Sequence, residues 1–315
     1  ESTCMHHGDA CCTISVKLQI PIEQALPFSS IKIKGDSQQN TTTTVKKAIG
    51  TTANPPVIIV GAGPTGIHAA REFVRSELAT ALREDLTRLY HSNNDSDDAN
   101  DQANVDSGVG LDYSSMSRRA LKNSALSLLS ASADTAFEQL AHAQLSNANN
   151  MTDGMAPLSA IVNAGNQKQS EHALSVFYQK WKGDAQVMEQ WFAVQSGSAP
   201  YADLPVIKAL MAHADFDISN PNKVRSVVGV FCNQNFVNFH CLSGAGYQFL
   251  ADQVIVLDDM NPQIASRLLT PLTRWKKYCA ARQVLMIEQL KRVHDKTNLS
   301  KDVREIVEKS LPHNP

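Results

Sequence analysis

From Leu111 to the C-terminus, apolar residues recur at three- and four-residue steps, which is the period of an α-helix. No run in this stretch alternates apolar and polar residues at period two, as a half-buried strand would. Pro157 falls inside one periodic segment, so we expect it to kink that helix or shift its start. Short connections favour antiparallel helix pairs. The sequence therefore predicts an all-α fold, an array of antiparallel helix pairs forming a superhelical, ARM/HEAT-like domain, with helices at roughly 113–131, 133–147, 150–164, 169–182, 184–196, 203–213, 221–234, 245–258, 262–278, 280–294 and 300–311.

The first third of the chain is less regular. Residues 1–60 contain short alternating stretches that prolines interrupt, so we expect an irregular segment ending in a linker. Residues 64–90 show helical periodicity throughout and predict one long amphipathic helix. Residues 91–110 are acidic and polar and predict a flexible loop. The predicted organisation is an irregular segment at 1–60 and a helical domain at 61–315, which contains the acidic loop 91–110.

A glycine-rich turn offers a different interpretation. Gly61, Gly63 and Gly66 follow an apolar run and precede a helix, in the G-x-G-x-x-G spacing of a dinucleotide-binding turn. Such a turn requires a second buried strand that ends in an acidic residue about 20 residues later. Residues 80–90 keep the helical period instead, so no βαβ unit is expected. A dinucleotide-binding protein using Gly61–Gly66 remains the weaker alternative.

Catalytic and metal-binding motifs are missing from the sequence. It contains no H-E-x-x-H, no G-x-S-x-G and no phosphate-binding P-loop. We therefore expect no catalytic residue, no bound cofactor and no metal in this chain. Trp181, Trp191, Phe192 and Trp275 lie at helical spacing and are expected in the core. One group near the N-terminus has side chains that could ligate a metal, but it lacks a second ligand pair at a recognisable spacing: Cys4, His6, His7, Cys11 and Cys12.

Composition excludes several classes of partner and compartment. The net charge of −2 argues against a general nucleic-acid interface. No apolar run reaches the about 18 residues needed to span a bilayer, so no membrane association is expected. Six scattered cysteines are too few for a disulfide scaffold and indicate thiols in a reducing compartment, cytoplasmic or an organelle stroma or matrix. The chain opens without Met, so we expect a processed chain or a fragment.

Two helices begin with the same signal and carry an internal arginine. Asn220-Pro221 and Asn261-Pro262 each combine a good N-cap residue with proline at the first helical position. Arg225 and Arg267 lie on the helices that follow. This parallel suggests one functional surface, and the alternative is two ordinary surface arginines.

Several long segments, in this order, resemble the C-terminal helical domain of alanyl aminopeptidase (aminopeptidase N), a zinc metallopeptidase family of the gluzincin type. The resemblance covers about residues 64–312. It implies a cap domain that closes over the catalytic domain and forms an internal chamber for peptide substrates. The zinc, its ligands and the catalytic groups of the family lie in domains that this sequence does not contain. The segments are IHAAREFVRSELATAL (67–82), RRALKNSAL (118–126), NNMTD (149–153), KWKGDAQVMEQWFAVQS (180–196), SNPNKVRSVVGVF (219–231), FHCLSGAGYQFL (239–250) and NPQIASRLLTPLTRWKKYCAARQVLM (261–286).

The resemblance assigns a role to the two arginines. Arg225 matches the second basic residue of the family's N-P-N-R-x-R-S run, and Arg267 matches the arginine of N-P-Q-V-A-S-R-L. Both are implied to face the chamber, where they can meet the C-terminal carboxylate of a peptide. Lys223 replaces a family arginine, which is tolerable if it lies outside, and Ser243 replaces an aspartate in the turn before Gly244.

Two functions follow from these observations. The first is the cap and substrate-chamber domain of a zinc-dependent, alanyl-type aminopeptidase, which removes N-terminal residues from peptides. Its implied partners are peptide substrates and the catalytic domain of the same enzyme, and the chain alone is expected to be inactive. The second is a non-catalytic helical peptide-binding or scaffold protein derived from the family.

Overall fold

The computed structural model describes residues 13–17, 57–61, 64–94, 113–132, 134–164 and 166–312. The chain divides into two compact units, 1–74 and 75–315. The group of cysteines and histidines at Cys4–Cys12, most of the predicted acidic loop and nearly all of the segment 1–60 lie outside the described residues. The predicted domain boundary at residue 60 stays a prediction.

The N-terminal unit contains two described strands. β1 (Thr13–Lys17) pairs antiparallel with β2 (Val57–Gly61), with Ser15 opposite Ile59. This strand pair lies at the segment predicted to be irregular, outside the predicted helical array, and its second strand is the apolar run before the glycine-rich turn. A dinucleotide-binding fold needs parallel strands joined by a helix. In the described residues β2 has an antiparallel partner and no strand follows it, so the weaker alternative receives no support.

The long helix predicted for 64–90 is wrong in one respect, because the structure has two helices here. α1 (Pro64–Ala81) ends before Leu82, and α2 (Arg83–Ser92) begins after it. Leu82 has φ −104° and ψ 15°, outside the usual helical values, although its carbonyl still accepts from the Leu86 N–H at 2.8 Å. The apolar period continues across this break, which is why periodicity alone did not reveal it.

The remaining chain is helical within the described residues, as predicted. The helices predicted at 113–131, 221–234 and 262–278 are each subdivided, and the four-residue helix α11 was not predicted. The bounds are α3 (Tyr113–Leu129), η3 (Ser130–Ser132), α4 (Thr135–Asn147), α5 (Met151–Asn163), α6 (Gln167–Trp181), α7 (Ala185–Gly197), α8 (Leu204–Met211), α9 (Pro221–Val224), η4 (Arg225–Gly229), α10 (Val230–Gln234), α11 (Phe236–Phe239), α12 (Ala245–Met260), α13 (Pro262–Leu268), α14 (Thr270–Thr273), η5 (Trp275–Lys277), α15 (Ala280–His294) and α16 (Lys301–Ser310).

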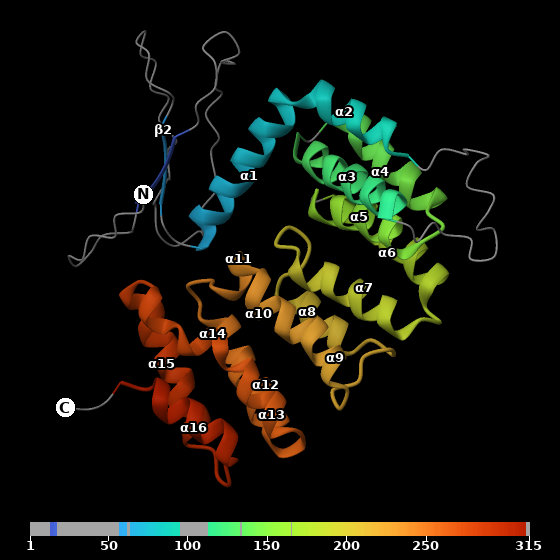
Figure 1. Cartoon of the computed structure of the whole chain (residues 1–315). Helices are drawn as coiled ribbons and strands as arrows, with labels where there is room; N and C mark the ends of the chain where they lie inside the picture. Colours follow the sequence, from blue (N-terminus) through green and yellow to red (C-terminus); the bar gives the residue numbers. More distant parts are fainter. Residues whose placement is uncertain are drawn as a thin grey trace. The chain divides into compact units, whose positions relative to one another are not determined.

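Helices close in sequence pack against one another along the second unit. α2 packs on α3, α3 and α4 on α5, and α5 on α6 and α7. α7 contacts η4 and α10, α12 packs on α13 and α15, and α16 contacts α13 and α15 (Figure 1). The core runs through this array and contains the fully buried rings of Phe177, Phe192, Phe231, Phe239 and Tyr247. Neighbour-on-neighbour packing is how helical repeat arrays bury their apolar faces.

The predicted core tryptophans occupy that core. Trp191 and Trp275 are buried, as is Phe192, and Trp181 is half-buried and packs against this core, beside the Phe177 ring. The indole N–H of Trp191 donates to the Leu174 carbonyl at 3.0 Å. The one polar atom of this ring is thereby satisfied, so the side chain can be buried at little cost.

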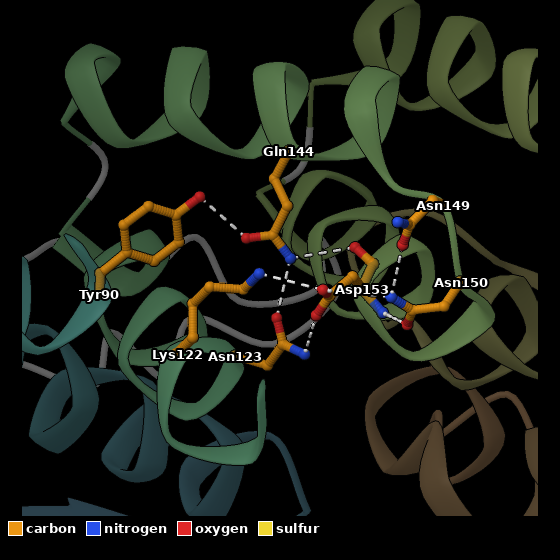
Figure 2. A network of polar contacts seen from close by, with 7 residues as sticks. All are labelled: Tyr90, Lys122, Asn123, Gln144, Asn149, Asn150 and Asp153. Carbon is orange, nitrogen blue, oxygen red and sulfur yellow. Dashed lines mark hydrogen bonds and ion pairs between the residues drawn. The ribbon is translucent and has the colours of Figure 1, made fainter. Parts of the chain in front are cut away.

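A buried polar network joins the first helices of this unit (Figure 2). The Lys122 ammonium lies 3.0 Å from Asp153 Oδ2, and Asn123 donates to Asp153 Oδ1 at 2.9 Å. Gln144 donates to Asn123 at 2.8 Å and accepts from the Tyr90 hydroxyl at 2.9 Å. α2, α3, α4 and α5 are therefore tied together through Asp153. Burial, followed by the Asp153 charge, raises the pKa of Tyr90, so the phenol stays a donor.

The network also explains why Pro157 is tolerated inside α5. Asn150 caps this helix by accepting from the Asp153 N–H at 2.9 Å, so the helix start is not moved. Pro157 has no N–H to donate to the carbonyl of Asp153, four residues earlier. Gln144 Nε2 donates to that carbonyl at 3.0 Å instead. The hydrogen bond that the proline removes is replaced from α4.

A second buried carboxylate anchors the connection between α15 and α16. Asp258 accepts from Lys296 Nζ at 2.8 Å and from the Ser300 N–H at 3.1 Å. Burial alone would raise the pKa of Asp258, but the hydrogen bonds from Lys296 and Ser300 outweigh it and hold that pKa below its usual value. The carboxylate therefore favours the folded state when it is ionised.

This carboxylate makes stability sensitive to acid. Because its folded-state pKa is lower than its unfolded one, the contribution is complete above about pH 5 and is lost as pH falls through the folded-state pKa. We expect Asp258→Asn to flatten the decline of the unfolding free energy between about pH 5 and pH 3, measured by urea denaturation. Asp259→Asn is the matched control, because its side chain is 71% exposed although it also contacts Lys296. An unchanged slope in Asp258→Asn would contradict the assignment.

Candidate functional site

A surface pocket of about 340 Å³ lies between the η4–α10 segment and α13. Both walls begin with an Asn-Pro helix start. Asn220 accepts from the N–H groups of Asn222 and Lys223, and Asn261 accepts from the Ile264 N–H at 3.2 Å. These caps fix where the two helices begin and therefore which residues reach the pocket. The lining residues are Arg225, Gly229, Val230, Asn233, Gln234, Ile264, Arg267 and Leu268.

The two arginines identified from the sequence both line this pocket. Arg225 and Arg267 come from different helices, and both side chains are exposed. Arg225 donates to Asn222 Oδ1 at 2.8 Å. Within the described part of the chain neither guanidinium has a carboxylate partner, and no acidic residue lines the pocket. Two such groups favour an anionic ligand, since guanidinium stays charged and can bind a carboxylate through two hydrogen bonds.

One wall of the pocket is a turn of π-helix. In η4 the Val230 N–H donates to the Arg225 carbonyl, five residues earlier instead of four. Ser226, Val227 and Val228 are buried by this turn, whereas Arg225 stays outside. Turns of this kind are frequent at functional sites. Sequence periodicity predicted one continuous helix at 221–234 and gave no sign of the extra residue in the turn.

The other lining residues were missed by sequence reasoning. Arg225, Gly229 and Asn233 follow one another at four-residue steps, so they share a helix face. That spacing could have revealed Gly229 and Asn233 once Arg225 was chosen. Gln234 and the apolar Leu268 carried no comparable signal. A second pocket of about 280 Å³ lies beside Arg267 and extends toward Lys309 of α16.

The predicted position of Lys223 is corrected by the structure. Lysine in place of the family arginine was expected to be tolerable if the residue lies outside. In the structure Lys223 is only 7% exposed. The ammonium lies 5.0 Å from the centroid of the Phe192 ring. A cation over an aromatic face is attracted by the ring, which offsets part of the cost of burial. Lys223 therefore packs against Phe192 of α7 beside η4, and it does not line the pocket.

The turn that carries Ser243 is shaped by the glycine after it. Gly244 has φ +73°, a left-handed conformation that glycine adopts without steric cost. Ser243 Oγ accepts from the Ala245 N–H at 3.4 Å, so the side chain retains a local polar contact at the start of α12.

A buried histidine joins this turn to α15. His240 Nδ1 lies 2.9 Å from the Tyr247 hydroxyl, and Nε2 lies 3.0 Å from the Tyr278 hydroxyl. Arg282 donates to the His240 carbonyl at 2.9 Å. Burial, followed by the charge of Arg282, lowers the pKa of His240 to about 4. The ring is therefore neutral at physiological pH and acts as a structural hub that holds α11, α12 and α15.

The cysteines divide by burial. Cys232 is buried, and burial raises its pKa well above the ordinary value, which keeps it a packed thiol. Cys279 is exposed, and although partial burial opposes the effect, hydrogen bonds from Arg282 lower its pKa.

In the described ranges no three His, Cys, Asp or Glu side chains are grouped so that they could hold a metal ion. These residues therefore do not fit the zinc site that the resemblance implies for the complete enzyme. We assign no metal ligand, and no chemical step that needs a metal, to them. None of the described helices combines the length and apolarity that a bilayer crossing demands.

The stacked helices define a domain of the helical-repeat class, with a cationic pocket on its surface. Residues 57–312 match the family described as "Domain of unknown function (DUF3458_C) ARM repeats", and the chain belongs to this family. The prediction of an ARM-like helical array is thereby confirmed.

Individual known proteins show more specifically what this chain is similar to. It is 38% identical over 248 residues to aminopeptidase N of Haemophilus influenzae, covering 79% of this chain and 27% of that protein. It is 36% identical over 249 residues to aminopeptidase N of Escherichia coli, with the same coverage. A solved structure of Legionella pneumophila aminopeptidase A in complex with aspartic acid matches with a TM-score of 0.66 and 30% identity, over 78% of this chain and 28% of that one.

These matches confirm the resemblance that the sequence indicated. The chain is homologous to the C-terminal region of aminopeptidase N. It spans little more than a quarter of the length of the relatives that it matches.

Proposed function

We propose that this chain is the cap and substrate-chamber domain of a zinc-dependent, alanyl-type aminopeptidase, which removes N-terminal residues from peptides. The zinc and the catalytic groups would belong to a separate catalytic domain of the same enzyme, which is the proposed partner. The observation that carries the proposal is the pair Arg225 and Arg267 in one pocket without a carboxylate partner among the described residues. The homology to aminopeptidase N supports it.

The role proposed for the pocket is to bind the C-terminal end of a peptide whose N-terminus lies at the catalytic centre. A peptide has one carboxylate at this end, and a guanidinium pair matches it in charge and geometry. The domain would also shield the reaction from bulk solvent and large substrates, as a closing lid does.

Peptide binding tests the role of the arginines. We expect Arg225→Ala combined with Arg267→Ala to weaken binding of Ala-Ala-Leu by about tenfold or more, because charged hydrogen bonds contribute about 1.5–3 kcal/mol. Binding of the C-terminally amidated peptide should change little. Isothermal titration calorimetry on the 315-residue chain gives both values. The matched control is Arg88→Ala with Arg274→Ala, two exposed arginines outside the pocket. Equal losses for the free and the amidated peptide would remove the proposed role.

The catalytic part of the proposal has its own test. The chain alone should not hydrolyse alanyl-arylamide substrates, and it should form a complex with the catalytic region of a related aminopeptidase N on gel filtration. Hydrolysis by the purified chain that a chelator abolishes would contradict this assignment.

A non-catalytic peptide-binding or scaffold protein is the second candidate. The observation that favours it is that the described residues form a pocket with two arginines but contain no group of His, Cys, Asp or Glu side chains that could hold a metal ion. The coding sequence upstream separates the two candidates: an in-frame H-E-x-x-H supports the aminopeptidase, and its absence supports the scaffold.

A further inference from the structure

The pocket between η4–α10 and α13 contains more than its two arginines. Val230, Ile264 and Leu268 form an apolar part of the lining. Ile264 and Leu268 are buried, and Val230 is half-buried, so these three side chains are held in place by the surrounding helices. An apolar surface beside two guanidinium groups suits a ligand that carries an apolar group next to its negative charge.

Gly229 keeps the space beside this apolar surface open. Its φ is −61° and its ψ −46°, so any residue could adopt this backbone. A Cβ at this position would meet Arg225 Cβ at 3.7 Å and Leu268 Cδ2 at 3.9 Å, which are ordinary contact distances. The backbone therefore does not require a glycine here. What the glycine provides is volume inside the pocket.

The amides in the lining favour a peptide over a simple fatty acid. Asn233 Nδ2 donates to the Gly229 carbonyl at 2.9 Å, which fixes the amide and leaves Asn233 Oδ1 as an acceptor. Gln234 adds a second exposed amide. An aliphatic acid has no donor for such acceptors, whereas a peptide bond has an N–H.

We propose that this pocket binds the apolar side chain of a peptide's C-terminal residue, and that Gly229 sets the size of the side chain it accepts. The inference rests on the proposed function, because it assumes that Arg225 and Arg267 bind the adjacent carboxylate. The volume of about 340 Å³ is at the lower end for ligand pockets, which fits one or two residues. Peptides ending in lysine or arginine bind poorly, because their charge lies beside the two guanidinium groups.

Four ligands test the inference on the 315-residue chain by isothermal titration calorimetry. They are Ala-Ala-Leu, Ala-Ala-Ala, Ala-Ala-Lys and 4-methylpentanoate, the last being an aliphatic acid without a peptide bond. Ala-Ala-Leu should bind about tenfold more tightly than Ala-Ala-Ala, because the larger side chain removes more apolar area from water when it enters the pocket. Ala-Ala-Lys and 4-methylpentanoate should bind more weakly than Ala-Ala-Leu.

Gly229→Ala tests the proposed role of the glycine. The added methyl group occupies pocket volume, so the preference for Ala-Ala-Leu over Ala-Ala-Ala should fall by at least threefold. The melting temperature should be unchanged or raised, since alanine favours a helix over glycine. Gly183→Ala is the matched control: nothing lies within 4 Å of the added Cβ, and the residue is outside the pocket.

The outcomes distinguish failure of this inference from failure of the proposed function. If the three peptides bind equally well, and amidation still weakens binding, the side-chain preference is overturned and the carboxylate role stands. If 4-methylpentanoate binds as tightly as Ala-Ala-Leu, the site is one for aliphatic acids. If amidation has no effect, or if no peptide binds, the proposed function fails and the inference fails with it. An unchanged preference in Gly229→Ala would remove the glycine as a size determinant.

Discussion

Asp153→Ala is expected to lower the free energy of unfolding by about 3–5 kcal/mol, because it leaves the buried Lys122 ammonium without its partner. Both side chains are only 7% exposed, and Lys122 Nζ lies 3.0 Å from the carboxylate (Figure 2). The same substitution also removes the acceptor of Asn123. Charge burial without compensation is among the largest single-residue effects known in folded proteins.

Urea denaturation monitored by circular dichroism measures this loss. Asp184→Ala is the matched control, since Asp184 is an exposed aspartate that caps α7 through the Gln186 N–H at 2.9 Å. Loss of a cap costs about 1 kcal/mol. Adding Lys122→Met to Asp153→Ala should recover part of the loss, because the second change removes the unpaired charge. A loss in Asp153→Ala no larger than that in Asp184→Ala would show that the ion pair does not stabilise the fold.

The sequence predicted helix starts better than helix interiors. Asn220 and Asn261 each cap a helix in the structure, as predicted, because a cap is a local property of a few neighbouring residues. Breaks inside helices were missed. The segment 262–278 is one apolar period, but α13 ends at Leu268 and α14 starts at Thr270, beside Pro271, which cannot donate a helical hydrogen bond.

The candidate site was also predicted only in part from the sequence. Arg225 and Arg267 could be chosen because their helices share a start signal and because the family resemblance marked them. The burial of Lys223 could not be predicted, since it depends on Phe192, a residue of α7 that is distant in sequence. The volume at Gly229 could not be predicted either, because it depends on Leu268 of α13, which is distant in sequence. The π turn at η4 has no periodicity signal that separates it from an ordinary helical turn.

Gly246→Ala is expected to destabilise the fold by about 3 kcal/mol or more, at the upper end of overpacking effects. Gly246 lies at the second position of α12, directly against α11. A Cβ here would lie 2.2 Å from the Phe239 carbonyl oxygen and 2.9 Å from Phe239 Cα. These are backbone atoms of a fully buried residue, so no side-chain rotation can relieve the overlap. Either α11 or α12 must move, and the Phe239–Tyr247 ring contact would be lost.

Thermal and urea denaturation of Gly246→Ala should be compared with Gly183→Ala and Gly229→Ala, whose added methyl groups meet no contact closer than 3.7 Å. The three substitutions are chemically identical. A large loss of stability in Gly246→Ala alone would therefore be caused by the close approach of α12 to Phe239. A similar stability in all three variants would show that this approach is not required. Because α11 follows α10 directly, and α10 supplies Asn233 and Gln234 to the pocket, a displaced α11 should also weaken Ala-Ala-Leu binding in the folded fraction at low temperature.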